Sequence, residues 1–159
     1  ESPMKILEFL NQKAVSANIK STEKEGVIRE LVDLLVKGGS INESDRDSLM
    51  KTLLNREALG STGIGQNIGI PHGKTNAVKE LVAAFGISKR GVNFDSLDGE
   101  PVYLFFLLIA PEDCAGPHLK ALARISRLLK DKFFRDALRQ ARDEKEIIRI
   151  IKEEDEKRN

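Results

Sequence analysis

The 159-residue chain has little cysteine, few aromatic side chains and almost no net charge. Cys114 is the single cysteine, so no internal disulfide can form. Lysine and arginine number 26 against 25 aspartates and glutamates, and aromatic residues make up 5% of the chain. A protein that binds nucleic acid directly needs a strongly basic field, and a disordered acidic tail needs a one-sided composition. Both classes are therefore disfavoured, and any surface for a partner must be a local one.

The sequence also lacks long apolar runs, linkers and repeats. No apolar stretch approaches the roughly 20 residues that span a bilayer, and no segment resembles a secretory signal. We therefore expect a reduced, soluble, cytoplasmic protein without stable membrane insertion. No stretch rich in Pro, Ser or Gly divides the chain, which predicts one domain over 4–153. Residues 1–3 are interpreted as a processing or cloning remnant, and 154–159 as a solvated, frayed tail.

Hydrophobic spacing predicts helices before and after a central group of strands. The first helix has an apolar stripe, a capping box at Thr22 and Glu25, and a stop at Gly38-Gly39. Further helices are expected at 42–60, 117–130, 133–141 and 145–152, and strands at 14–19, 81–87 and 102–110. The last two strands are continuous apolar runs, which are typical of strands buried on both faces.

Arg90-Gly91 follows the first of these two strands. The connection between the strands is too short for a crossover helix, so the strands must be antiparallel. Helices that precede and follow buried strands can cover both faces of a sheet. The predicted fold is therefore an α/β three-layer sandwich, with a mixed β-sheet flanked by helices on both faces.

The most informative segment is rich in glycine and runs from Arg56 to Lys74, REALGSTGIGQNIGIPHGK. Glycines let backbone N–H groups approach an anion, Ser61 and Thr62 add hydroxyl donors, and Arg56 carries a planar guanidinium suited to phosphate oxygens. The segment lacks the Gly-Lys-Ser/Thr end of a P-loop, and Ile68 stands where a dinucleotide-binding segment has its third glycine. The pattern favours phosphate binding without a nucleotide. For Arg56 alone, a solvated arginine paired with a neighbouring acid explains the sequence equally well.

One of the two histidines, His72, ends this segment between Pro71 and Gly73. Pro71 restricts the backbone before it and Gly73 leaves its far side uncrowded, so the imidazole would be held rigidly at a strand end. A neutral imidazole can accept a phosphoryl group on one nitrogen while a hydrogen bond holds the other, and no cofactor is required. Taken alone, such a triplet is more often a turn with an exposed histidine. The glycines and hydroxyls nearby make a functional histidine more plausible than the triplet alone would. His72 is therefore the candidate nucleophile.

The other histidine, His118, follows Pro117, a residue suited to the first position of a helix. The first turn of a helix favours anions, so His118 would help to surround a phosphoryl group if the fold brings it beside His72. The alternative is an exposed histidine near a helix cap. Cys114 and His118 supply at most two metal ligands, so we expect no metal site. The lysines and arginines at 120–130 are interpreted as the solvated face of an amphipathic helix.

Together these residues resemble the enzyme IIA domains of the fructose and mannitol type, from the bacterial phosphoenolpyruvate-dependent sugar phosphotransferase system. The resemblance covers nearly the whole chain. The family signature begins at an acidic or amide residue, here Glu57, and continues through Ile64-Gly65 to the run Ile68-Gly69-Ile70-Pro71-His72-Gly73. Gly69 stands where the family usually has alanine, and this difference removes no reactive group. The order of Asp98-Gly99-Glu100-Pro101-Val102, the apolar run to Pro111 and His118-Leu119 also matches.

The resemblance implies a phosphoryl carrier and a role for each candidate residue. In this family the histidine of the Pro-His pair, here His72, accepts a phosphoryl group from the carrier protein HPr and passes it to a cysteine of an enzyme IIB domain. His118 matches the histidine that hydrogen-bonds the phosphoryl group, and Arg56 matches the arginine that helps to neutralise it. Thr62 is a weaker candidate for an oxygen contact. The resemblance also implies a mixed sheet flanked by helices, and transfer without a metal or another cofactor.

Within the family, the run Leu59-Gly60-Ser61-Thr62-Gly63 is most similar to the nitrogen-regulatory enzyme IIA proteins. Those proteins stand alone, receive phosphate from a dedicated HPr-like carrier and bind their target proteins in one phosphorylation state. The sequence therefore supports two functions: a phosphocarrier that serves an enzyme IIB, and a regulatory module whose phosphorylation controls binding. An anion-binding domain without phosphotransfer is a third possibility, and a IIA domain within a larger protein fits the same residues.

Overall fold

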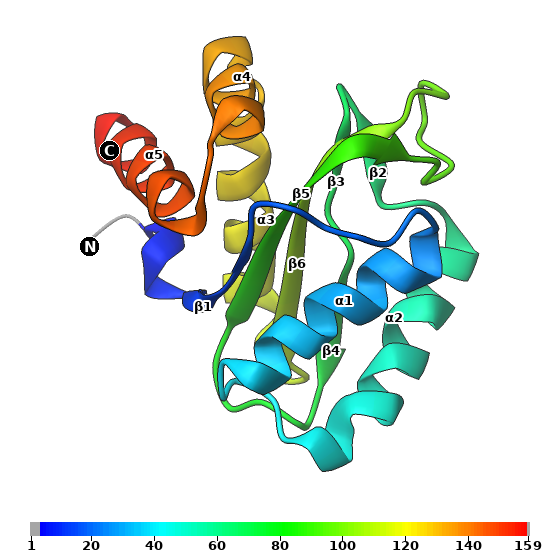
Figure 1. Ribbon diagram of the computed structural model, residues 1–159. Helices are drawn as coiled ribbons and strands as arrows, with labels where there is room; N and C mark the ends of the chain where they lie inside the picture. Colours follow the sequence, from blue (N-terminus) through cyan, green and yellow to red (C-terminus); the bar gives the residue numbers. More distant parts are fainter. Residues whose placement is uncertain (1–3, 159) are drawn as a thin grey trace.

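Within residues 4–158, which the computed structural model describes, six strands form one mixed sheet (Figure 1). The strands are β1 (Leu10–Ser16), β2 (Gly63–Gly65), β3 (Ile68–Gly69), β4 (His72–Thr75), β5 (Val82–Val92) and β6 (Val102–Pro111). Their order is β1-β5-β6-β3-β2, and β4 pairs with β6 as well. Strands β5 and β6 are antiparallel, whereas β1 runs parallel to β5, and β3 and β4 run parallel to β6. The predicted mixed sheet is confirmed.

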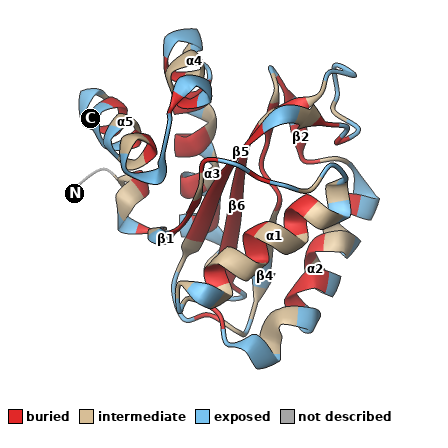
Figure 2. Ribbon diagram, in the orientation of Figure 1, coloured by how far each residue is buried: buried red, intermediate tan, exposed pale blue. Residues whose placement is uncertain are grey.

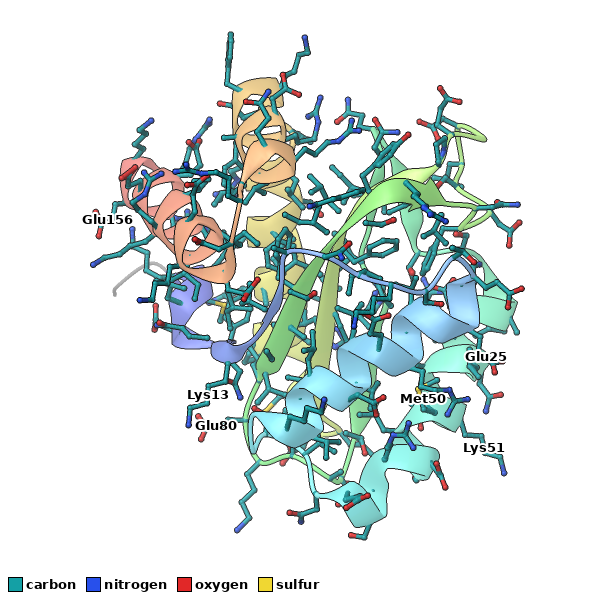
Figure 3. The ribbon with its side chains drawn as sticks, in the orientation of Figure 1. Lys13, Glu25, Met50, Lys51, Glu80 and Glu156 are labelled. Carbon is teal, nitrogen blue, oxygen red and sulfur yellow. The ribbon has the colours of Figure 1, made fainter. Side chains whose placement is uncertain are left out.

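Helices cover both faces of this sheet, as the three-layer prediction requires. The helices are α1 (Lys24–Lys37), α2 (Arg46–Leu59), α3 (Ala115–Leu129), α4 (Lys132–Gln140) and α5 (Glu144–Lys157), with short 3-10 turns at Ile6–Glu8 and Glu43–Asp45. Figure 1 shows α1 and α2 on one face, and α3, α4 and α5 on the other. The side chains between these layers are drawn in Figure 3, where Met50 of α2 is buried while the adjacent Lys51 extends from the surface.

Strand β6 separates the two halves of the core. Its side chains alternate between a cluster shared with α3, α4 and α5 and a cluster shared with α1 and α2; the first set is Leu104, Phe106 and Leu108, and the second is Phe105, Leu107 and Ile109. Figure 2 shows the central strands buried and the outer helix faces exposed. Each large apolar side chain buried in this way contributes about 1.5–3 kcal/mol. Burial on both faces explains the unbroken apolar run in the sequence.

Several element boundaries differ from the sequence predictions; β1, for example, spans Leu10–Ser16 and not 14–19. Strand β5 does not end before Arg90-Gly91 but continues to Val92, which pairs with Val102 of β6. Gly91 adopts a φ of +85°, a conformation open to glycine, so the strand irregularity is accommodated there. Helix α1 begins at Lys24, and its N-cap residue makes no side-chain capping bond, so the predicted capping box at Thr22 is wrong.

The predicted frayed tail at 154–159 is also wrong over the residues that the structure describes. Helix α5 continues to Lys157, and Asp155 is 2% exposed. Its carboxylate accepts hydrogen bonds from the Ile6 N–H at 2.5 Å and from Arg124 Nε at 2.8 Å. Arg124 is 6% exposed, so it does not belong to the solvated face predicted for 120–130. A buried ion pair between distant segments has no signature in local charge spacing.

The remaining terminal interpretation, that residues 1–3 are a remnant, lies outside the described residues. From residue 4 to residue 158, no helix combines the length and the apolar character needed to cross a bilayer.

Candidate functional site

The backbone around His72 is held by hydrogen bonds on both sides. A tight turn at Gln66 and Asn67, both with positive φ, returns the chain from β2 into β3. After β3, the Ile70 N–H donates to the Thr62 carbonyl at 3.0 Å, and the Leu108 N–H donates to the Pro71 carbonyl at 3.0 Å. His72 is the first residue of β4, paired with Leu108 of β6. The imidazole therefore projects from a strand end, as the sequence predicts.

One ring nitrogen of His72 is already in use. Nδ1 lies 2.7 Å from the Ile70 carbonyl oxygen, and a carbonyl can only accept, so Nδ1 carries the proton and donates. Nε2 then keeps its lone pair. Burial lowers the pKa of His72; the Ile70 carbonyl opposes this shift, and the nearby Arg56 guanidinium reinforces it. The ring is consequently neutral at pH 7, with Nε2 as its nucleophilic atom.

The structure brings His118 against His72. The two ring centroids are 5.5 Å apart and the rings meet edge to face at 81°. Helix α3 begins at Ala115, two residues before Pro117, and the His118 N–H already donates to the Cys114 carbonyl at 3.1 Å. Its backbone is therefore unavailable for an anion, and only the side chain can act.

The His118 side chain is 5% exposed, and within residues 4–158 its Nε2 has no hydrogen-bond partner. Burial lowers the pKa of His118 to about 4, and His72 and Lys74 contribute to the same shift. The ring is neutral near pH 7, so it can offer a proton on Nε2 to an oxygen placed beside His72. A buried polar atom without a partner is costly, which makes a bound oxygen the natural partner for Nε2.

The buried neutral state of His118 makes stability depend on pH. In the unfolded chain this ring takes up a proton near pH 6.5, whereas in the native protein it does so only near pH 4. As the pH falls from about 6.5 to about 4, the free energy of unfolding should drop by about 2–3 kcal/mol from this group. Urea titrations of the wild type and of His118→Gln at pH 7 and pH 4.5 measure the effect, because the carboxylates contribute equally to both proteins. An identical pH dependence of the two proteins would contradict it.

Arg56 lies in the last turn of α2 and is half-buried. Its guanidinium donates to the Gly60 carbonyl at 2.7 Å, so it is held by a backbone oxygen and not by the neighbouring acid that the alternative reading supposes. It lies close enough to lower the pKa of His72. A guanidinium carries five N–H groups, and this bond occupies one of them. Arg56 can therefore place positive charge beside His72.

Thr62 is buried, and its hydrogen bonds go to Glu57. Its hydroxyl and its backbone N–H both donate to the Glu57 carboxylate. Glu57 in turn pairs with Lys24 Nζ at 3.2 Å. The sequence marks Glu57 as a signature position without a role, and no local signal points to Lys24, which lies 33 residues away along the chain.

Cys114, the other candidate metal ligand, occupies the N-cap position of α3 without a side-chain capping bond, and its Sγ lies 3.7 Å from Asp113 Oδ1. Burial raises the pKa of the Cys114 thiol, and Asp113 raises it further. Within residues 4–158 no three histidine, cysteine, aspartate or glutamate side chains converge to hold a metal ion. The groups that lie closest to the His72 ring include the imidazole of His118 and the guanidinium of Arg56.

Comparison with known proteins identifies the family of this chain. A family model described as "Phosphoenolpyruvate-dependent sugar phosphotransferase system, EIIA 2" matches residues 8–154. The fructose-specific EIIABC component of Bacillus subtilis is 46% identical over 152 residues, which cover 96% of this chain and 24% of that protein. A nitrogen regulatory protein of Bradyrhizobium diazoefficiens is 36% identical over 148 residues, covering 93% of this chain and 95% of its own length. This chain thus spans about a quarter of the first relative and nearly all of the second.

A solved structure leads to the same family. The nitrogen regulatory protein IIA-Ntr from Neisseria meningitidis superposes with a TM-score of 0.82 at 32% identity, over 91% of this chain and 97% of that one. Residues 8–154, which the family model matches, include all six strands, helices on both faces and both histidines. The chain therefore belongs to the EIIA 2 family of the phosphoenolpyruvate-dependent sugar phosphotransferase system, and is a component of a phosphotransferase.

Proposed function

We propose that this domain accepts a phosphoryl group on Nε2 of His72 from an HPr-type carrier protein and passes it on. The observation that carries the proposal is the pairing of a neutral His72, held through Nδ1 by Ile70, with the buried and unpartnered Nε2 of His118. A nucleophile and a hydrogen-bond donor for the transferred group are thus pre-positioned in one place.

The transfer step is a single displacement at phosphorus. The lone pair of His72 Nε2 forms the new P–N bond while the bond between phosphorus and the donor side chain breaks, and the donor atom keeps that electron pair. The proton on Nδ1 stays in its hydrogen bond to the Ile70 carbonyl, which stabilises the positive charge that the ring gains. In a second displacement, a cysteine thiolate of an enzyme IIB forms a P–S bond while the P–N bond breaks and its electron pair returns to Nε2, which leaves His72 neutral.

His118 and Arg56 supply the stabilising groups for the phosphoryl oxygens. His118 Nε2 offers a neutral donor from a buried position, and Arg56 offers a cation from the end of α2. Thr62 joins them only if its hydroxyl leaves Glu57, so its contribution is proposed for the phosphorylated state. No cofactor enters this scheme.

Incubation with enzyme I, an HPr and labelled phosphoenolpyruvate tests the proposal. The wild-type protein is expected to become labelled in an acid-labile, base-stable form, which is the behaviour of a phosphohistidine. Mass spectrometry of the labelled protein should place the group on His72. An unlabelled protein, or a label on another residue, would refute the assignment.

Replacing His118 should separate acceptance from onward transfer. His118→Ala keeps the nucleophile and is expected to accept label, but to pass it to an enzyme IIB about 10- to 100-fold more slowly because the buried donor is gone. His118→Gln, which keeps an N–H donor, should recover part of that rate. Single-turnover transfer from the phosphorylated variants measures both rates. Complete loss of acceptance in His118→Ala would show that His118 is needed earlier than proposed.

A regulatory role is the second candidate, and the match over nearly the full length of two nitrogen regulatory proteins favours it. In that role the phosphorylation state of His72 would control binding to a target protein, and onward transfer would be incidental. A pull-down from the native cytosol with phosphorylated and unphosphorylated protein distinguishes the two. Recovery of an enzyme IIB alone supports sugar transport, whereas state-dependent recovery of a kinase or a potassium-transport regulator supports regulation.

A further inference from the structure

A buried carboxylate lies next to the proposed phosphoryl site and is not used by the transfer step. The Glu57 side chain, in the last turn of α2, is 4% exposed. It accepts the Thr62 N–H at 3.2 Å, the Thr62 hydroxyl, and a charged hydrogen bond from Lys24 Nζ at 3.2 Å. A buried carboxylate without such donors would be strongly destabilising. Glu57 thus depends on Lys24 for its neutralising charge.

Lys24 is the first residue of α1, and Figure 1 shows the start of α1 beside the end of α2. Its side chain is 21% exposed, and Nζ also lies 3.3 Å from Asp95 Oδ2 and 4.9 Å from the centroid of the Phe94 ring. The ammonium is therefore held by α2 and by the segment between β5 and β6. This is more than an exposed surface pair, which is typically worth little.

A continuous chain of hydrogen bonds connects Lys24 to the His72 ring. Lys24 donates to Glu57, and Glu57 accepts from Thr62. The Thr62 carbonyl accepts the Ile70 N–H at 3.0 Å, and the Ile70 carbonyl accepts His72 Nδ1–H at 2.7 Å. The position of the carbonyl that orients His72 thus depends on the buried ion pair.

Of the two charges of this pair, Glu57 raises the pKa of His72, and Lys24 places the opposite charge beside Glu57. A phosphoryl group on Nε2 brings about two negative charges to the site. Glu57 repels them, and Lys24 compensates for Glu57. Losing Lys24 would leave the repulsion uncompensated, and neutralising Glu57 would remove it. In a partly buried site, removing one of these charges should change the equilibrium constant for phosphoryl transfer several-fold.

We propose that Lys24 and Glu57 are positioning residues for His72, which orient its ring through Thr62 and Ile70 and shift the phosphoryl-transfer equilibrium in opposite directions. This inference deepens the phosphocarrier function proposed above and rests on it.

The first test uses Lys24→Met and Glu57→Gln, with Lys37→Met, an exposed lysine near the end of α1, as the matched control. The equilibrium between phosphorylated HPr and this protein is measured for each. Lys24→Met is expected to shift the equilibrium constant several-fold toward the donor, and Glu57→Gln several-fold toward phosphorylated His72. Lys37→Met should match the wild type. Glu57→Gln should fold, because the amide still accepts from Thr62 and the family signature admits an amide here. A purely structural role would move both variants in the same direction, and that outcome would overturn the proposal.

The second test needs no phosphoryl donor. The His72 ring is faced by Arg56 and Glu57 from α2 and by His118 from α3, while Lys74 follows on its own strand. NMR titration of the unphosphorylated protein should show a higher His72 pKa in Lys24→Met and a lower one in Glu57→Gln. Unchanged values in both folded variants would overturn the inference. An unlabelled wild-type protein would instead refute the phosphocarrier assignment, since these two pKa shifts are measured independently of it.

Discussion

A His72→Gln variant is expected to accept the phosphoryl group from HPr more slowly than the wild type, on the order of 10³-fold or more. Glutamine approximates the size and hydrogen-bonding capacity of the imidazole, but its amide nitrogen has no lone pair free to attack phosphorus. The loss should therefore come from the missing nucleophile and not from altered packing. A time course of labelling from phosphoenolpyruvate, enzyme I and HPr measures it.

The control for this experiment is the neighbouring histidine. His118→Gln leaves Nε2 of His72 and its bond to the Ile70 carbonyl in place, so it should be labelled to near completion. Circular dichroism and urea unfolding of both variants establish that they are folded. Labelling of His72→Gln at the wild-type rate would mean that another residue is the acceptor, and the proposed mechanism would fall with it.

The largest effect on stability is expected near the C-terminus, where Asp155→Ala should lower the free energy of unfolding by about 3–5 kcal/mol. Asp155 is the buried partner of Arg124, and it also accepts the backbone N–H of Ile6. Removing the carboxylate leaves a buried guanidinium and a buried amide without their acceptor. Urea denaturation at pH 7 measures the loss.

Glu153→Ala is the matched control on the same helix. Glu153 pairs with Arg149 on the exposed face of α5, where such a pair contributes less than about 1 kcal/mol. The double variant Asp155→Ala, Arg124→Met should regain part of the lost stability, because it removes the stranded charge. If Asp155→Ala were no more destabilising than Glu153→Ala, the end of α5 would be dispensable, as the sequence by itself suggests.

The layered fold was predictable because its signals are local. The run Val102–Pro111 is apolar at every position up to its final proline, and this pattern arises when consecutive side chains enter two cores on opposite faces. The short connection from β5 to β6 requires an antiparallel pair, and the helical stripes on either side require helices to cover the sheet. The fold class can therefore be predicted from the spacing of apolar residues within segments of about ten to fifteen residues.

Two of the predictions that failed concern charged residues. Arg124 belongs to a basic stripe, and Asp155 to a run of acids and lysines, so each resembles a solvated residue in its own segment. Their burial depends on a partner 31 residues away. The contact of Thr62 with a phosphoryl group stays a prediction, and in the structure the Thr62 hydroxyl donates to Glu57. For Arg124 and Asp155 the partner is set by tertiary packing.

The sequence by itself determined the α/β class, the family and the identity of the two histidines, because periodicity and a short motif are properties of neighbouring residues. Only the tertiary structure decided that the two ring centroids lie 5.5 Å apart, that Nδ1 of His72 donates to the Ile70 carbonyl, and that Lys24 pairs with Glu57. Distances between segments remote in sequence depend on how the sheet and its two helical layers pack together. Packing, unlike periodicity, is a property of the whole chain.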